Sequence, residues 1–247
     1  MRDLWLLPAG FIAGICNAIA GGGSLLTFPV FLALGYPPYI ANVTNAVGIF
    51  TSNIGAVWGY RTQLRTEPRL VAVLGAAGVL GAVVGSVLLL QTGETAFEAL
   101  VPFLVAAGAL LVLVQPRLVA VVQRSATTAG AHARIAVVVT SVVCIYGGYF
   151  GAAMGVMLLG VFGALLHRPL QQLNAYKNAV ALCVNATCLV LFALFAPVAW
   201  AAAGWMSIGT VLGGLVGARV AKRLSDRYLR LCIVALGLGA AVMVALQ

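Results

Sequence analysis

The chain has 247 residues, of which 63% are hydrophobic and only 8% are charged, and its mean hydropathy is +1.09. Soluble domains carry about 25% charged residues, so this composition excludes a sizeable soluble domain and indicates an integral membrane protein. The net charge of +9 does not indicate nucleic-acid binding, because the basic residues lie in short segments between apolar runs, where they orient membrane spans. Long charge-free runs favour helices over a β-barrel.

The first predicted element is a helical hairpin over residues 4–37. Residues 4–60 contain no charged side chain, and a triple glycine at 21–23 interrupts them. Irregular backbone at membrane depth is tolerated only where it is buried in protein or lines a polar cavity. We therefore expect two helical arms that turn at these glycines, with Ser24 as the N-cap of the second arm. Free N–H groups and a positive dipole end there would suit an anion. The alternative is that the glycines serve only close helix packing.

Three spans are expected after this hairpin, followed by a basic segment: 40–60, 70–91, 99–116 and then 117–141. The loop at 61–69 carries three arginines, so the positive-inside rule predicts that it is cytoplasmic. The charged residues of the loop at 91–98 are Glu94 and Glu98, so this loop should lie outside.

An internal repeat is visible in the order of the glycines and asparagines. Two pairs of segments match without gaps: residues 12–47 with 145–180, and residues 79–85 with 211–217. We interpret residues 1–116 and 142–247 as two membrane repeats of one membrane domain. The segment at 117–141 would hold a cytoplasmic linker and the start of the second repeat.

The second repeat should begin with its own hairpin, at 135–170. Gly155 aligns with Gly22, which puts the second turn at the place equivalent to the first. Met154 and Val156 flank Gly155 where the first repeat has glycines, so this turn is expected to be bulkier. Three more spans are expected after this hairpin, at 175–196, 200–221 and 230–247.

The charge pattern is exchanged between the two repeats. The basic loop 61–69 corresponds to an uncharged turn at 196–200, and the acidic loop 91–98 corresponds to a basic stretch at 222–230. The repeats are therefore predicted to lie in opposite directions with both termini outside, an arrangement typical of transporters with a site at the repeat interface. The alternative is eight plain spans with parallel halves, which would place 61–69 or 222–230 on the wrong side.

Polar stripes run along the helix that follows each hairpin. They comprise Asn42, Asn45, Ser52 and Asn53 in the first repeat, and Asn174, Lys177, Asn178 and Asn185 in the second. Such amides either line a cavity for a polar substrate or hold helices together. Lys177 is either a charge partner for an anion or a marker of the cytoplasmic helix end. The candidate substrate-binding residues are Gly22, Gly23, Ser24, Asn45, Gly155, Asn174, Lys177 and Asn178.

Several kinds of chemistry have no support in the sequence. The five acidic residues all fall at predicted loops or helix ends, so no intramembrane proton or sodium relay is expected. There is no Walker motif and no catalytic constellation, and the five cysteines have no metal-ligand spacing. We therefore predict that the protein is not an enzyme and needs no cofactor or metal. Its predicted partners are a small anionic substrate and the lipid bilayer; the oligomeric state stays open.

The motifs together resemble the TauE/SafE family of sulfite and organosulfonate exporter-like permeases. The resemblance covers essentially the whole chain and rests on Gly21-Gly22-Gly23 with Pro29, on the segment 147–155, on Asn174-Ala175-Tyr176-Lys177-Asn178, and on the segment 212–219. It implies a multi-pass protein of the cell (plasma or inner) membrane that exports a small sulfur-containing anion, such as sulfite or sulfoacetate, by alternating access. The alternatives are a membrane scaffold or assembly subunit and an intramembrane enzyme.

Overall fold

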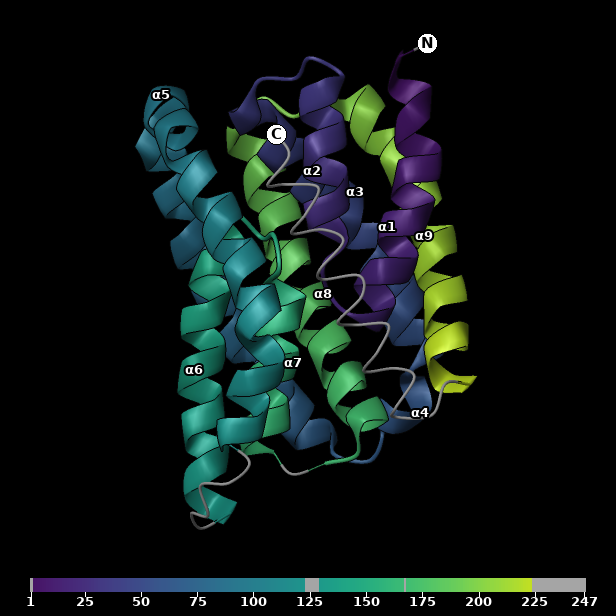
Figure 1. Ribbon diagram of the computed structural model, residues 1–247, viewed down its shortest axis with the longest axis vertical. Helices are drawn as coiled ribbons and strands as arrows, with labels where there is room; N and C mark the ends of the chain where they lie inside the picture. Colours follow the sequence, from purple (N-terminus) through teal and green to yellow (C-terminus); the bar gives the residue numbers. More distant parts are fainter. Residues whose placement is uncertain (1, 123–128, 167, 224–247) are drawn as a thin grey trace.

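The computed structural model describes residues 2–122, 129–166 and 168–223. For residues 108–122 and 129–133 it describes the backbone alone. Every regular element in these ranges is a helix, as predicted (Figure 1). The elements are η1 (Arg2–Trp5), α1 (Leu6–Ile19), α2 (Gly23–Ala33), α3 (Pro38–Gly59), α4 (Arg61–Leu64), α5 (Pro68–Val122), α6 (Ala129–Tyr149), α7 (Met154–Leu165), α8 (Leu170–Phe195) and α9 (Trp200–Arg223). The span expected at 230–247 lies outside the described residues.

The first hairpin, α1–α2, turns at the predicted glycines. Gly21 has φ +88°, a backbone conformation that glycine adopts without steric cost. The N–H groups of Ala20 and Gly21 both donate to the carbonyl of Cys16, at 2.7 and 3.1 Å, and so end α1. Ser24 is not the N-cap of α2, because Gly22 takes that position and Ser24 lies inside the first turn.

The second hairpin, α6–α7, turns earlier than the gapless alignment predicts. The N–H groups of Phe150 and Gly151 donate to the carbonyl of Tyr146, and Gly151 has φ +76°. This is the hydrogen-bond pattern that ends α1, so Gly151 is the counterpart of Gly21. The expectation of a turn at Gly155 with bulky neighbours is therefore wrong. Gly155 and its neighbours belong to the first turn of α7.

The long helix α5 is a second kind of hairpin, with its turn at Gly93. Gly93 has φ +74° and ψ 173°, which breaks the helix into arms at 68–92 and 94–122. Both arms reach the same part of α6: a Cβ on Gly85 would lie 1.9 Å from the carbonyl oxygen of Ile145, and Tyr146 Oη donates to the carbonyl of Leu104 at 3.5 Å. The expected loop at 91–98 is thus a turn at one residue, because glycine can reverse the chain there without a longer connection.

Each hairpin packs mainly against helices of the other half. In α9, Gly213 and Gly217 allow contact with α1, since a Cβ on Gly213 would lie 2.1 Å from the carbonyl oxygen of Phe11. In α5, Gly81 allows the same close contact with α6, since a Cβ on Gly81 would lie 2.2 Å from the carbonyl oxygen of Ser141. Figure 1 shows α1 running from the N-terminus toward the middle of the molecule, whereas α6 approaches the middle from the opposite end. The matched glycine segments therefore make matching contacts.

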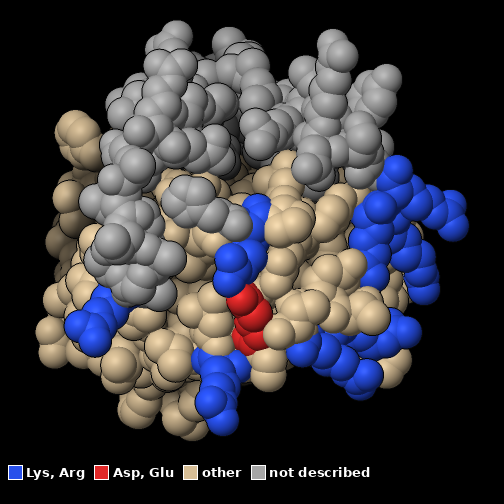
Figure 2. All heavy atoms as spheres, turned by 90° about the horizontal axis from the view of Figure 1, so that it is seen from below, with Lys and Arg blue, Asp and Glu red and all other residues tan. Residues whose placement is uncertain are grey.

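The charged segments divide between the two ends of the bundle. Lys222 Nζ lies 5.7 Å from the ring centroid of Tyr60, and Gln171 Nε2 donates to the carbonyl of Ala221 at 2.6 Å, so the loop after α3 and the end of α9 share one end. Figure 2 shows this end from below, with several clusters of Lys and Arg around one acidic patch. Tyr39 lies at the start of α3 and Tyr60 at its end, so Phe97, which packs on Tyr39, lies at the other end together with its neighbours Glu94 and Glu98.

The basic end is expected to face the cytoplasm, with both chain termini outside. In a cysteine-free variant, single cysteines at Arg65, at Arg223 and in the segment 123–128 should react with a membrane-impermeant maleimide only from the cytoplasmic side. A cysteine at Glu98 should react only from the outside. Labelling of positions 65 and 223 from opposite sides would contradict the inverted arrangement of the two halves.

Candidate substrate site at the broken helices

The carbonyl end of α1 is surrounded by polar side chains of α8. Lys177 Nζ donates to the carbonyl oxygens of Asn17 at 2.8 Å and Ala18 at 3.4 Å. The Nδ2 groups of Asn174 and Asn178 donate to the same Ala18 oxygen at 3.1 and 3.2 Å. The last carbonyls of a helix lack partners within the helix and carry the negative end of its dipole, so an ammonium and two amide donors stabilise them.

Lys177 is a buried cation that pairs with none of the carboxylates in the described part of the chain. It lies about 10 Å along α8 from Leu170 and is only 1% exposed. The two ion pairs among the described residues are Arg2–Asp3 and Glu67–Arg168. Because carbonyl dipoles alone compensate the ammonium, its burial is costly until a negative charge arrives. This burial favours the charge partner over the marker of the cytoplasmic helix end, and the role of Lys177 stays a prediction.

Two amide oxygens at the same place have no hydrogen-bond partner. They are Oδ1 of Asn174 and Oδ1 of Asn178, and both are buried. The amide orientations are set by carbonyl acceptors, since Asn178 Nδ2 also donates to the carbonyl oxygen of Asn174 at 2.9 Å. Turning either amide would bring two oxygens together. The two oxygens are thus acceptors that lack a donor, and a ligand or a water can provide one.

The stripe on α3 is also buried, and it meets the other half in a matching way. Asn42 Nδ2 donates to the carbonyl of Tyr149, at the end of α6, at 3.0 Å. Pro37 and Pro169 occupy the same position before α3 and α8, so Asn42 corresponds to Asn174 and Asn45 to Lys177. The gapless alignment, which pairs Asn45 with Asn178, is one residue out of register here.

Most amides of α3 find partners within the protein. Asn45 Oδ1 accepts a hydrogen bond from Thr27, and Asn17 Nδ2 donates to Ser52 Oγ at 2.7 Å and to Asn53 Oδ1 at 3.1 Å. Asn53 Nδ2 is the exception, since it is buried without a partner. Helix-to-helix contact therefore accounts for much of this stripe, whereas α8 carries the unpaired acceptors and the cation.

The glycines of the two hairpins touch each other. A Cβ on Gly21 would lie 2.4 Å from Gly155 Cα, so neither position has room for a side chain. Gly22, Gly23 and Ser24 begin α2 beside this contact. Of the predicted residues, Gly155 thus lies against Gly21, next to Gly22–Ser24 in the chain. Asn174, Lys177 and Asn178 bind the carbonyls of Asn17 and Ala18, a few positions before these glycines.

Two further residues of this candidate site, Asn17 and Tyr60, were not predicted from the sequence. Asn17 was visible as an isolated amide in an apolar run, and it supplies both a carbonyl for Lys177 and a side chain for α3. Tyr60 gave no signal; its hydroxyl accepts from Asn174 Nδ2 at 2.9 Å, a contact between residues far apart in the sequence.

Comparison with known proteins identifies the family. The family model described as "Sulfite exporter TauE/SafE" matches residues 6–244. The chain belongs to the TauE/SafE family. Relatives include a "Probable membrane transporter protein ORF9" of Sinorhizobium sp, 28% identical over 98% of this chain and 94% of that protein. The "Probable membrane transporter protein YfcA" of Escherichia coli K12 is 28% identical over 93% and 84%, and a "Probable membrane transporter protein" of Haemophilus influenzae 25% over 93% and 89%. No solved structure gives a significant match.

As a member of the TauE/SafE family, the chain is a membrane transporter protein whose helices lie in a bilayer. In the described part of the chain, three helical segments are long and apolar enough to cross it: Pro68–Ala107, which includes the turn at Gly93, Leu170–Phe195 and Trp200–Arg223. Large apolar side chains such as Phe103, Leu194 and Leu80 are about two-thirds exposed or more, as expected for residues that face lipid. α3 has the length of a span, but its polar stripe lowers its hydropathy.

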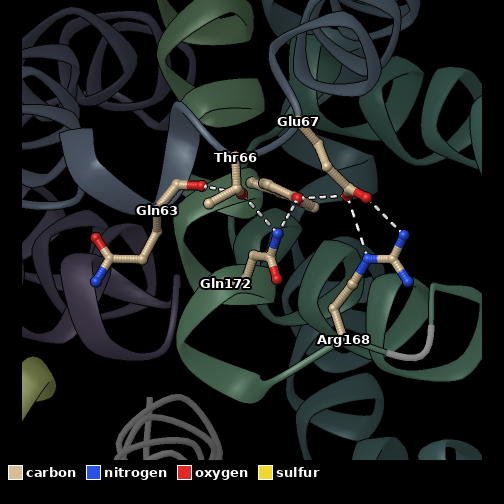
Figure 3. A network of polar contacts seen from close by, with 6 residues as sticks. Gln63, Thr66, Glu67, Arg168 and Gln172 are labelled. Carbon is tan, nitrogen blue, oxygen red and sulfur yellow. Dashed lines mark hydrogen bonds and ion pairs between the residues drawn. The ribbon is translucent and has the colours of Figure 1, made fainter.

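At the basic end of this transporter, a polar network joins the two halves (Figure 3). Arg168, before α8, donates through Nε to Glu67 Oε2 at 3.2 Å and through a second nitrogen to Oε1. Tyr176 Oη also donates to Glu67, at 2.6 Å, and Gln172 Nε2 donates to Thr66 Oγ1 at 2.8 Å. The hydrogen bonds from Arg168 and then from Tyr176 hold the pKa of Glu67 below its ordinary value of 4.5.

Replacing Glu67 with glutamine should lower the melting temperature of the protein at pH 7 by about 2–4 °C, because a partly exposed pair contributes about 1 kcal/mol at most. The folded pKa is depressed, so this contribution is complete above about pH 4.5 and is lost as the pH falls through the lowered value. The difference between wild type and Glu67→Gln should therefore shrink in acid. Glu98→Gln, on the opposite end, is the matched control and should change little. A difference that stays constant down to pH 3 would contradict the role of this pair.

Proposed function

We propose that the protein exports a small sulfur-containing anion, such as sulfite, sulfoacetate or a related organosulfonate, across the cell membrane. The observation that carries this proposal is the buried Lys177 ammonium, which pairs with none of the described carboxylates and binds the carbonyls at the end of α1, a few residues before the glycine that meets the second hairpin. A small anion is the ligand that would compensate this charge most directly. The description of the family model as a sulfite exporter supports the sulfur-containing class.

The proposed anion site lies between the two broken helices. Lys177 would hold the negative charge, while the backbone of Gly22, Gly23 and Ser24 and that of Gly155 would line the site. Gly22 has the most room of these glycines, since a Cβ there would meet its nearest neighbour at 3.8 Å. Asn45, Asn174 and Asn178 would orient the anion. The unpaired oxygens of Asn174 and Asn178 would accept from a hydroxyl or another donor of the substrate, or from a water that accompanies it.

Alternating access would follow from the way the halves interlock. α1 packs on α9 and α6 packs on α5, so each half holds one hairpin of the other. Rocking of one pair against the other would expose the site to one side at a time, as in transporters built from inverted repeats. The network around Glu67 joins the loop before α5 to the start of α8, which supports closure of the basic end in this structure.

The test is a flux screen in liposomes that contain the purified protein. Sulfite, sulfoacetate, sulfate and simple carboxylates are offered separately, with empty liposomes and Lys177→Met liposomes as controls. We expect saturable flux of at least one sulfur-containing anion, and little in either control. If no anion in the screen crosses faster than through empty liposomes, the scaffold interpretation replaces this proposal. Flux of carboxylates alone would contradict the substrate class.

A further inference from the structure

The surroundings of the Lys177 ammonium have the composition of a monovalent-cation site. The carbonyl oxygens of Asn17 and Ala18 meet the ammonium at 2.8 and 3.4 Å, at the C-terminal end of a helix that stops inside the bundle. Carbonyl oxygens at the C-terminal ends of half-helices are the groups that bind Na⁺ in transporters with broken helices. Here the chain provides the cation itself, through the side chain of Lys177.

The neighbouring amides add oxygen ligands that the protein leaves unused. Oδ1 of Asn174 and Oδ1 of Asn178 are buried and have no partner, while Nδ2 of each amide donates to the Ala18 oxygen. An amide oxygen lies about 2.2 Å from its own nitrogen, so both oxygens lie within about 6 Å of the Ala18 oxygen. The end of α1 thus has two carbonyl oxygens that accept from the Lys177 ammonium, and nearby are two amide oxygens that accept from no donor.

Among the described residues, no carboxylate pairs with the Lys177 ammonium, so its positive charge is left for another partner. The described acidic residues are Asp3, Glu67, Glu94 and Glu98, and none of them pairs with Lys177. A transported anion would therefore find its positive charge already in the site, held by the dipole end of α1. Without that ammonium, the protein would have to bind a cation from solution before the anion could bind.

We propose that the carbonyl end of α1 is a monovalent-cation site that Lys177 occupies from within the chain, and that it binds a free cation of the size of Na⁺ once the side chain is shortened. Lys177→Ala removes the ammonium together with most of its stem and leaves room at the carbonyls. Lys177→Met also removes the charge, but its side chain keeps the space filled. Only the alanine variant should therefore become dependent on sodium.

The first experiment measures cation binding without transport. The melting temperature of each purified variant is recorded in NaCl and in choline chloride of equal ionic strength. We expect sodium to raise the value for Lys177→Ala by about 5 °C or more at saturation, with no rise for the wild type or for Lys177→Met. Lys177→Ser, which is also short, should behave like Lys177→Ala. Equal values in the two salts for both short variants would overturn the proposal, and so would failure of both to fold in sodium salts.

The second experiment rests on the proposed function, because it needs a transported anion. In liposomes, flux through Lys177→Ala should fall at least tenfold in choline and recover severalfold in sodium, while wild-type flux is the same in both. Wild-type protein that moves no anion would count against the proposed function and leave the melting result to decide the cation site. Wild-type flux with a short variant that sodium does not rescue would count against the cation site alone.

Discussion

Replacing Lys177 with methionine is expected to weaken anion binding by about 30-fold or more. The ammonium is 1% exposed and pairs with none of the described acidic residues, so an anion in the site would lose its counter-charge in a place that excludes water. Loss of one partner of a buried charge pair costs about 2 kcal/mol or more, which corresponds to this factor. Equilibrium binding of the anion that the flux screen identifies, measured calorimetrically on purified protein, provides the number.

Folding should be affected much less than binding by the same substitution. Methionine loses the hydrogen bond to the Asn17 carbonyl, but it also removes a buried charge whose desolvation is unfavourable, and Ala18 keeps two amide donors. The melting temperature of the anion-free variant should therefore stay within a few degrees of wild type. Lys222→Met, an exposed lysine at the basic end, is the matched control and should leave both properties unchanged. Intact anion binding in Lys177→Met would show that Lys177 serves only as a helix-end cap.

The membrane potential alone is expected to drive export to about a 50-fold gradient. Moving one negative charge outward from an inside-negative cell gains roughly 2.3 kcal/mol per 100 mV, and roughly 1.4 kcal/mol corresponds to a tenfold gradient. The described helices inside the bundle carry one buried cation and no buried carboxylate that could relay protons or sodium. Flux in liposomes should therefore follow a potential imposed with potassium and valinomycin.

The control for this prediction separates the potential from the proton gradient. A protonophore is added while the potassium potential is held, and flux should persist. Among the described residues, Glu67 is the acidic residue at the basic end and accepts a hydrogen bond from Tyr176 of α8, so Glu67→Gln is tested in the same assay and should keep its response to the potential. Flux that ignores the potential and stops when the proton gradient collapses would show that the anion travels with a proton.

Local features of the chain determined much of the architecture by themselves. Charge-free runs longer than one span, broken by glycines, predict helical hairpins because backbone hydrogen bonds must be satisfied within the membrane. The first turn falls at Gly21. The residues of both polar stripes, on α3 and on α8, are buried, as their helical spacing predicts. The distribution of basic residues also predicted which segments share one end of the bundle, since the loop after α3 and the end of α9 lie together. Each of these properties depends on residues close together in the sequence.

Only the tertiary structure decided what the buried polar groups touch. The second turn uses Gly151 rather than Gly155, because the carbonyl of Tyr146 takes two N–H donors and ends α6 early. The sequence left Lys177 as either a helix-end marker or a site residue. The structure adds that its ammonium lies on the carbonyls of Asn17 and Ala18, some 160 residues earlier, and its part in anion binding stays a prediction. A helix end with free carbonyls has no signature in its own residues, and its partners come from whichever helix packs across it. The sequence therefore predicted that the polar stripes exist, whereas the packing of α8 across α1 determined which groups they bind.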